Sequence, residues 1–334
     1  MKMRYKTLYQ VAAGLFLAVL PMCAGHAQEL SFYYGRNSAG DLGSTYSWQI
    51  DYRQHFLRYF VWSASWINEG HIPDHHRDGY ASELWAEAPL FNRKMAVAAG
   101  GGFYRYYDTQ PNADRTDSLD VHGWAPIASL SATYYTKSPW LLRLTMNWLM
   151  PRDDIQTRTV VVGFGYRLWA SSADKSTSAT AVEEKPISRV TSNEVTLSLG
   201  KSVVNTLNSQ DGVAASLEFR KGFARYGDWS VSYINEGDAE IIHRGGIAGQ
   251  AWLTDVFLDQ KLTVAFGAGP YVFVDRDQDD ENRSDVTGIV TPSISWRFND
   301  HLLARLNWNR IITGYHRDTD TFLLGIGYRW GGHS

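Results

Sequence analysis

The chain of 334 residues contains one cysteine, Cys23, and outside its first residues it has no run of apolar residues long enough for a membrane helix. Cys23 lies in a predicted leader at residues 1–27, so the mature chain is expected to hold no cysteine. Disulfides, thiolate catalysis and thiolate-based zinc sites are thereby excluded for the mature protein. The chain also has no excess of basic residues. Its formal net charge is -3, which argues against nucleic acid as a partner.

The first 27 residues have the layout of a cleavable secretory signal peptide. Three basic residues precede the apolar run from Val11 to Leu20, and small residues lead to Ala27. Cleavage after Ala27 is preferred over lipid attachment at Cys23, because the large Met22 stands directly before the cysteine. We therefore expect the chain to be exported, and we exclude the leader from the fold.

The most informative feature that is present is an internal repeat with a shift of 167 residues. The segment Ser-Trp-Ile-Asn-Glu-Gly at 65–70 returns as Ser-Tyr-Ile-Asn-Glu-Gly at 232–237. The same register, without a gap, pairs Arg53 with Arg220, Phe56 with Phe223, Trp62 with Trp229, His76 with His243, Arg77 with Arg244, Trp85 with Trp252 and Tyr104 with Tyr271. Self-similarity over this length predicts two copies of one structural unit.

Alternation with a period of two predicts β-strands with two different faces. Within residues 140–148 apolar side chains alternate with small or polar ones, and residues 304–309 repeat the pattern. Aromatic side chains gather near strand ends, at Trp48, Trp62, Trp66, Trp140 and Trp148. The opposite face is rich in Gly, Ala, Ser and Thr, which fit a narrow barrel interior. A soluble sandwich would show the same alternation with the apolar face inward, but the aromatic girdles and the small interior residues favour a transmembrane antiparallel β-barrel.

Eight strands are predicted in the first unit, joined alternately by short and long connections. The strands are expected at about 30–36, 45–53, 58–68, 80–88, 95–107, 124–135, 140–149 and 158–169. The long connections include 69–79 and 108–123. Outer-membrane barrels have short periplasmic turns and longer outer loops, which places both ends of the unit on the periplasmic side. The second unit repeats this plan from about Val195 to Trp330.

Residues 170–193 are rich in Ser, Ala, Thr, Lys and Glu without any periodic apolar pattern, which predicts a flexible periplasmic linker. The expected organisation is a signal peptide at 1–27, a first barrel at 28–169, the linker and a second barrel at 194–334. Two eight-stranded barrels are preferred, because one merged sheet would need only a short turn between the eighth and ninth strands. The alternative is a single sixteen-stranded barrel, whose interior would hold an aqueous channel.

Charged residues fall on the face assigned to the interior of each unit. The inward set comprises Asp51, Arg53, Glu83, Arg143 and Arg167 in the first unit and Glu218, Arg220, Gln250, Arg305 and Arg329 in the second. In a closed lumen an unpaired ion would be very costly, so these charges would have to neutralise one another. The alternative is that they line open water.

The sharpest cluster of possible chemistry follows the third strand, where Asn68, Glu69, Gly70 and His71 are succeeded by Asp74, His75, His76, Arg77 and Asp78. Imidazoles and carboxylates gathered there could bind a divalent metal or supply a general acid and base, with Glu69 and His76 as catalytic candidates. The second copy lacks most of the extra histidines and aspartates, so the shared residues have a structural interpretation: Asn and Gly suit turns, and Glu and Arg can form an ion pair. The candidate rim residues are Asn68, Glu69, His71, His76, Arg77, Asn235, Glu236, His243 and Arg244.

Each unit closes on a similar segment, Gly-Phe-Gly-Tyr-Arg-Leu-Trp at 163–169 and Gly-Ile-Gly-Tyr-Arg-Trp at 325–330. A final strand that ends on an aromatic residue resembles the signal that outer-membrane barrels present to their insertion machinery. In size per unit and in topology the chain resembles the small eight-stranded outer-membrane barrels, among them the lipid A palmitoyltransferases and 3-O-deacylases, duplicated in tandem. The resemblance implies the outer membrane of a Gram-negative bacterium. No segment matches the serine and histidine motif of the deacylases.

The expected function is non-enzymatic: a structural or binding protein of the cell envelope whose outer loops contact lipopolysaccharide or polysaccharide. Its expected partners are outer-membrane lipid and the insertion machinery during assembly, and no cofactor is expected. A second hypothesis is a lipid A-modifying acyl hydrolase or transferase that uses Glu69 and His76. A third is a sixteen-stranded channel for a solute or an exported polymer.

Overall fold

The structure, a computed structural model, describes residues 28–152, 154–169, 193–224, 226–239, 241–258, 260–276 and 282–331. The predicted signal peptide at 1–27 lies outside these residues. So does the predicted linker at 170–193, except for Asn193, which begins a strand. In the described part of the chain no helix is long and apolar enough to cross a membrane.

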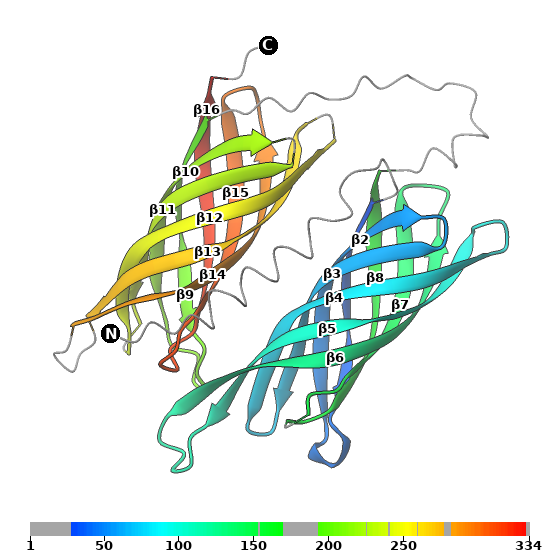
Figure 1. Ribbon diagram of the computed structural model, residues 1–334, viewed down its shortest axis with the longest axis horizontal. Helices are drawn as coiled ribbons and strands as arrows, with labels where there is room; N and C mark the ends of the chain where they lie inside the picture. The colour runs from blue at the N-terminus through cyan, green and yellow to red at the C-terminus, as the bar shows by residue number, and fades with distance from the viewer. Residues whose placement is uncertain are drawn as a thin grey trace. The chain divides into compact units, whose positions relative to one another are not determined.

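The first unit is one sheet of eight antiparallel strands that closes on itself (Figure 1). The strands are β1 (Gln28–Ser38), β2 (Ser44–Leu57), β3 (Phe60–Ile72), β4 (His75–Leu90), β5 (Met95–Pro111), β6 (Ser118–Tyr135), β7 (Trp140–Leu149) and β8 (Thr157–Trp169). Each strand pairs with the next along the chain, and β8 pairs back with β1. A single 3-10 turn, η1 (Gly40–Leu42), lies between β1 and β2.

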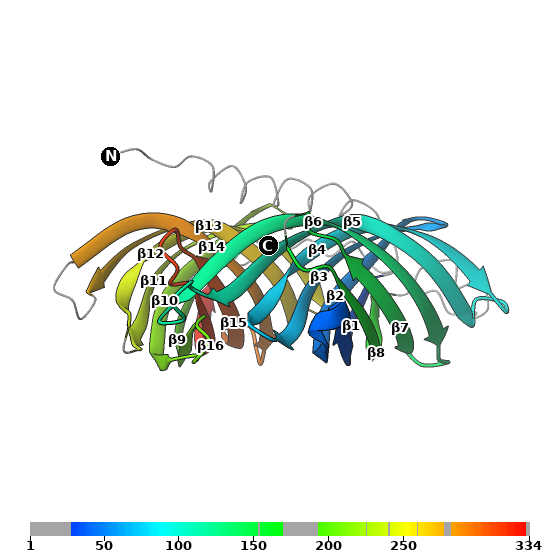
Figure 2. The same ribbon diagram turned by 90° about the horizontal axis from the view of Figure 1, so that it is seen from below.

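The second unit has the same order and closes separately. Its strands are β9 (Asn193–Val204), β10 (Asp211–Ala224), β11 (Gly227–Asp238), β12 (His243–Phe257), β13 (Leu262–Arg276), β14 (Asn282–Arg297), β15 (Leu302–Ile312) and β16 (Thr319–Trp330). Figure 2 shows how the strands of each unit curve as they run around its barrel. The predicted all-β class with two eight-stranded units is confirmed. The single sixteen-stranded barrel is wrong, because both edges of β8 are used within the first unit, by β7 and β1, leaving none for β9.

The exterior of both barrels is apolar over the middle of the strands. Along β7, Trp140, Leu142 and Leu144 are about half exposed, whereas Arg143 between them is buried. In β16 the exposed positions are Phe322, Leu324, Ile326 and Tyr328, and the alternate positions are buried. A soluble protein turns such side chains inward, so this belt is the surface that a transmembrane barrel presents to lipid.

The interior of each barrel is filled by side chains, and the two barrels repeat one arrangement. In the first barrel the guanidinium carbon of Arg53 lies 3.9 Å from the ring centre of Trp85, whose indole nitrogen donates to Ser63. In the second, Arg220 lies 3.5 Å from the ring centre of Trp252, which donates to Ser230. A cation over an aromatic face is stabilised most where water is excluded.

Ion pairs neutralise five of the arginines assigned to the interior, Arg53, Arg143, Arg220, Arg305 and Arg329. Arg167 instead donates to the backbone carbonyls of Thr136 and Ser138 in the β6–β7 turn. Arg143 is 1 % exposed and pairs with Glu29, while Arg53 donates to Asp51 at 2.7 Å. In the second barrel Arg305 donates to both Glu218, at 2.6 Å, and Glu194, at 2.5 Å. The pairs of Arg143 with Glu29 and of Arg305 with Glu218 join strands that are distant in sequence, and their side chains are buried. The interpretation that the charges line open water is therefore wrong.

The strands extend further at one end than the sequence predicted. We call the end that carries the first residue of β1 the inner end and the opposite end the outer end, and we use the same terms for β9. Most of the predicted long connections at 69–79 and 108–123 belong to paired strands at the outer end. Both sheet faces carry polar residues there, so the alternation that marks a half-apolar strand is lost.

Candidate functional site

The repeated Asn-Glu-Gly element forms a β-bulge at the outer end of each barrel. The strand register shifts between Asn68 and His71 in β3, and between Asn235 and Gly237 in β11. Gly70 has a φ of 72°, and its N–H donates to Asn68 Oδ1 at 2.9 Å. Gly237 has a φ of 79° and donates to Asn235 Oδ1 at 3.0 Å. Positive φ favours glycine, so the repeated sequence is explained by a repeated local geometry.

Each bulge directs its glutamate into the barrel, where it meets the repeated arginine. Arg77 Nε and one terminal nitrogen donate to the two oxygens of Glu69, each at 2.8 Å. Arg244 makes the same two-pronged contact with Glu236, each at 2.6 Å. All four side chains are buried. Paired donors in this geometry match a carboxylate closely and give the strongest form of charge-assisted hydrogen bond.

A threonine from the last strand of each barrel completes the pair. Thr157 in β8 donates to Glu69 and accepts from Arg77 at 3.1 Å. Thr319 in β16 donates to Glu236 at 2.5 Å and accepts from Arg244 at 2.7 Å. The network therefore links the third and fourth strands of each barrel to its eighth strand across the interior.

The structure does not bring the catalytic candidates Glu69 and His76 together. Glu69 faces the interior, whereas His76 precedes the inward Arg77 and so lies on the outer face of β4. There its ring lies 4.1 Å, centre to centre, from the ring of His71, which is exposed. In the second barrel the equivalent His243 is exposed, and its backbone N–H donates to Asp275 at 2.9 Å.

Asp74 lies at the tip of the β3–β4 turn and joins a neighbouring loop. It accepts two hydrogen bonds from Arg115 in the β5–β6 loop, at 2.5 and 3.1 Å. The hydrogen bonds from this guanidinium hold the pKa of the Asp74 carboxyl below its usual value. The tips of two outer hairpins are thereby tied together in the first barrel.

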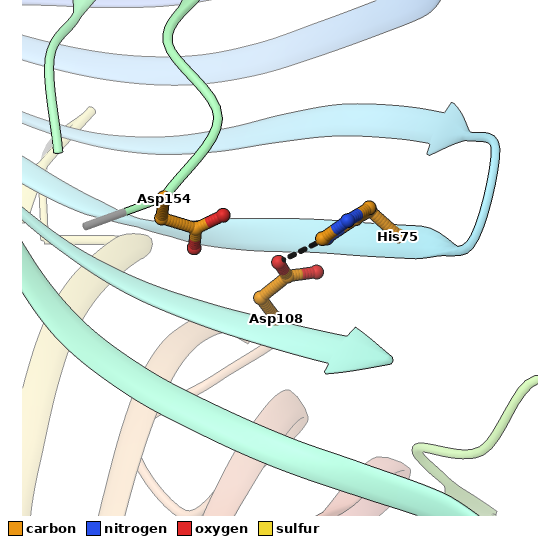
Figure 3. Close-up of side chains that lie close together, drawn as sticks. All are labelled: His75, Asp108 and Asp154. Carbon is orange, nitrogen blue, oxygen red and sulfur yellow. Dashed lines mark hydrogen bonds and ion pairs between the residues drawn. The ribbon is translucent and has the colours of Figure 1, made fainter. Parts of the chain in front are cut away.

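A group that the sequence did not predict lies just inside the outer end of the first barrel: His75, Asp108 and Asp154 (Figure 3). One donor atom from each residue lies within 4.8 Å of the other two. His75 Nδ1 is 2.7 Å from Asp108 Oδ2, and this hydrogen bond raises the pKa of His75 although partial burial opposes it. His75 was among the residues of the sequence cluster. Asp108 and Asp154 were missed because they come from β5 and from the connection before β8.

The alternation of side chains along a strand was the one signal that could have predicted that Asp108 faces the interior. It lies four residues after Tyr104, which occupies a repeated interior position, so it faces inward as well. Asp154 precedes β8 in a connection without regular structure, and no periodic pattern indicates where its side chain points.

No protein-family model matches the sequence, and no curated protein matches it either. Among solved structures, the chain is similar to the N-terminal β-barrel domain of Pseudomonas aeruginosa OprF, with 9% identity and a TM-score of 0.36 over 43% of this chain and 99% of that one. Neisserial surface protein A is matched at 9% identity and a TM-score of 0.33, over 43% and 97% of the two chains. The Ralstonia pickettii toluene transporter TbuX is matched at 9% identity and a TM-score of 0.25, over 93% and 90%. The two-barrel fold follows from the strand pairing and does not depend on these similarities.

Proposed function

We propose that this chain is an integral outer-membrane protein with a structural or binding role, whose outer hairpins contact lipopolysaccharide or another envelope polysaccharide. The observation that carries the proposal is the combination of a lipid-type exterior with a filled interior. An exposed belt of leucine, valine, phenylalanine and tryptophan suits a bilayer, and it requires that both barrels be inserted. The predicted signal peptide and the aromatic ends of β8 and β16 fit export and delivery to the insertion machinery.

The filled interior supports a role at the surface and not one in transport. Eight strands leave room for side chains alone. Here the space is crossed by buried ion pairs such as Arg143–Glu29 and Arg305–Glu218. Moving a solute through either barrel would break these pairs and leave buried charges without partners, at about 3–5 kcal/mol for each broken pair.

The outer hairpins offer the surface for binding. A membrane-spanning strand needs about 9–11 residues, whereas β5 and β6 contain 17 and 18. The excess rises beyond the apolar belt and ends in the exposed loop 112–117. This loop is ordered by Asn112, whose side-chain oxygen accepts from the backbone of Thr116 and Asp117, and by the Asp74–Arg115 pair. A preformed polar surface loses little conformational entropy on binding.

The proposal predicts that the outer loop, and not the inner turn, determines binding to lipopolysaccharide. Replacing residues 112–117 by a Gly-Ser segment of equal length is expected to weaken binding of the purified full-length protein to smooth lipopolysaccharide at least tenfold. The same replacement of the inner turn 136–139 is the matched control and is expected to leave affinity unchanged. Absence of binding by the unaltered protein, or an equal loss in both variants, would contradict the proposal. Rough lipopolysaccharide as a second ligand separates contact with lipid A and core from contact with the distal polysaccharide.

One observation favours the second candidate, a lipid A-modifying acyl hydrolase or transferase. His75 and Asp108 form a histidine–carboxylate pair, an arrangement that enzymes use to orient a general base. Mass spectrometry of lipid A from cells with and without the protein tests this candidate. It predicts a change of acyl chain content that Asp108→Asn abolishes, whereas identical spectra from both cells would rule it out.

A further inference from the structure

We infer that His75, Asp108 and Asp154 form a binding site for one divalent transition-metal ion at the outer end of the first barrel. The inference goes beyond the proposed surface-binding role and does not depend on it. It starts from atoms that the described residues leave without hydrogen bonds. Asp108 is 1 % exposed, and its Oδ1 is buried without a hydrogen-bond partner among those residues. A buried carboxylate oxygen left in this way is costly unless a ligand is present.

Asp108, which carries the unsatisfied oxygen, is one of the three possible ligands. Asp108 Oδ2 accepts from His75 and, at 2.9 Å, from Gln110, so that Oδ1 alone remains. Within the described residues Asp154 Oδ2 also has no hydrogen-bond partner, and it lies 3.5 Å from a terminal nitrogen of Arg77. The three donors thus lie close to one another, Asp108 is buried whereas His75 and Asp154 are partly exposed, and one oxygen of each aspartate is left without a hydrogen bond among the described residues.

At the equivalent position of the second barrel, a tyrosine side chain occupies the space beside the aspartate and the arginine. Asp275 and Arg244 are the repeat counterparts of Asp108 and Arg77. The hydroxyl of Tyr315 donates to Asp275 Oδ2 at 2.7 Å and accepts from Arg244 at 2.9 Å, so one hydroxyl satisfies both. In place of His75 the second barrel has Ile242, which packs in an apolar cluster. Where the second barrel has a tyrosine and an isoleucine, the first has a carboxylate and a histidine, so a contact closed by one hydroxyl in the second barrel is a set of possible metal ligands in the first.

Charge and ligand type identify the class of ion. An imidazole that binds a metal ion does so in its neutral form. The carboxylates of Asp108, Asp154 and Glu69 then outweigh the guanidinium of Arg77 by two negative charges. One divalent cation balances that excess. One nitrogen and two carboxylate oxygens suit zinc or manganese better than calcium or magnesium, which prefer oxygen alone. Three protein ligands also leave a coordination position for water.

The test is metal binding by the full-length protein in detergent after treatment with EDTA. Titration with zinc chloride and with manganese chloride, followed by calorimetry and by metal analysis, is expected to show one tightly bound ion per chain. His75→Ala and Asp108→Asn are each expected to weaken binding at least tenfold. His75 is partly exposed, so its replacement should keep the fold, which heat-modifiable gel mobility verifies.

Two matched controls separate this site from the alternatives. Asp275→Asn alters the counterpart in the second barrel and is expected to leave binding unchanged. The double variant His71→Ala/His76→Ala removes the pair of histidines on the outer face and should have no effect either. The inference is overturned by a chain that binds neither zinc nor manganese, or that binds calcium alone. It is equally overturned by binding that survives Asp108→Asn but disappears with His71 and His76.

Discussion

Arg77→Met is expected to destabilise the first barrel by about 3–5 kcal/mol, the cost of leaving one member of a buried ion pair without its partner. Arg77 is 1 % exposed and Glu69 is fully buried. The substitution removes both hydrogen bonds that Arg77 makes to Glu69 and the one that it makes to Thr157. Methionine retains an unbranched side chain of similar reach, so the loss reports on charge and hydrogen bonding more than on volume. Urea unfolding in lipid vesicles, followed by tryptophan fluorescence, measures the difference.

Two comparison variants show whether the effect arises from the uncompensated charge. The double variant Arg77→Met/Glu69→Gln removes both charges and is expected to recover a substantial part of the stability, because a neutral amide costs less to bury than an unpaired carboxylate. Arg115→Met breaks the pair with Asp74, whose members are largely exposed, and should leave the unfolding curve in place. Equal curves for Arg77→Met and Arg115→Met would show that the buried pair does not hold the barrel together.

Glu83→Gln, unlike Arg77→Met, is expected to stabilise the first barrel. The expected gain is about 1–3 kcal/mol, because a buried polar group without a hydrogen bond usually costs that much. Glu83 is 1 % exposed, and within the described residues neither of its carboxylate oxygens has a hydrogen-bond partner. The second barrel already carries the proposed residue at this position, Gln250, whose amide donates to Thr291 at 2.9 Å. The substitution therefore places in the first barrel the residue that occupies the equivalent interior position of the second barrel.

The matched control is Glu218→Gln in the second barrel. Glu218 accepts from Arg305 at 2.6 Å and from Arg220 at 3.2 Å, so its neutralisation weakens two buried contacts and is expected to lower stability. Urea unfolding of the two variants should shift in opposite directions. A loss of stability in Glu83→Gln as large as that in Glu218→Gln would show that favourable charge interactions hold Glu83 in place, and the prediction would then be wrong.

The sequence was sufficient to predict the strands that cross the membrane, because only there do lipid and interior impose opposite demands on alternate residues. The same demand identified the interior arginines: placing Arg143 or Arg305 on the lipid face near the midplane would cost about 2–4 kcal/mol each. Both are buried inside their barrels. The repeat of 167 residues then predicted two copies of one sheet.

The outer end could not be predicted in the same way. Beyond the membrane both faces of a strand tolerate polar residues, so β3 and β4 continue through segments that read as loop. The grouping of His75 with Asp108 and Asp154 depends on this continuation and on the curvature of the barrel, which brings β4, β5 and the β7–β8 connection together. The spacing of these three residues along the chain therefore does not predict that their side chains lie close together.

The repeated Asn-Glu-Gly element shows what the structure adds to a sequence motif. As a sequence it was compatible with a catalytic role for Glu69 or with a structural role at the rim of each barrel. The geometry gives each residue a role in both copies: Asn accepts from the glycine N–H, the glycine adopts positive φ, and the glutamate binds the buried arginine. The features specific to the first copy, His75 above all, are where the two barrels differ in chemistry.

The central claim is that the chain forms two independent barrels, each closed by its own strands and filled by its own side chains. It is tested most directly by expressing residues 28–169 alone and following the gel mobility of the refolded product with and without heating. We expect this half to insert into lipid vesicles and to migrate as a compact, heat-modifiable species, because β8 closes on β1 without any strand of the second unit. A half that fails to insert, or that gains heat-modifiable mobility only when residues 193–331 are added, would contradict the claim.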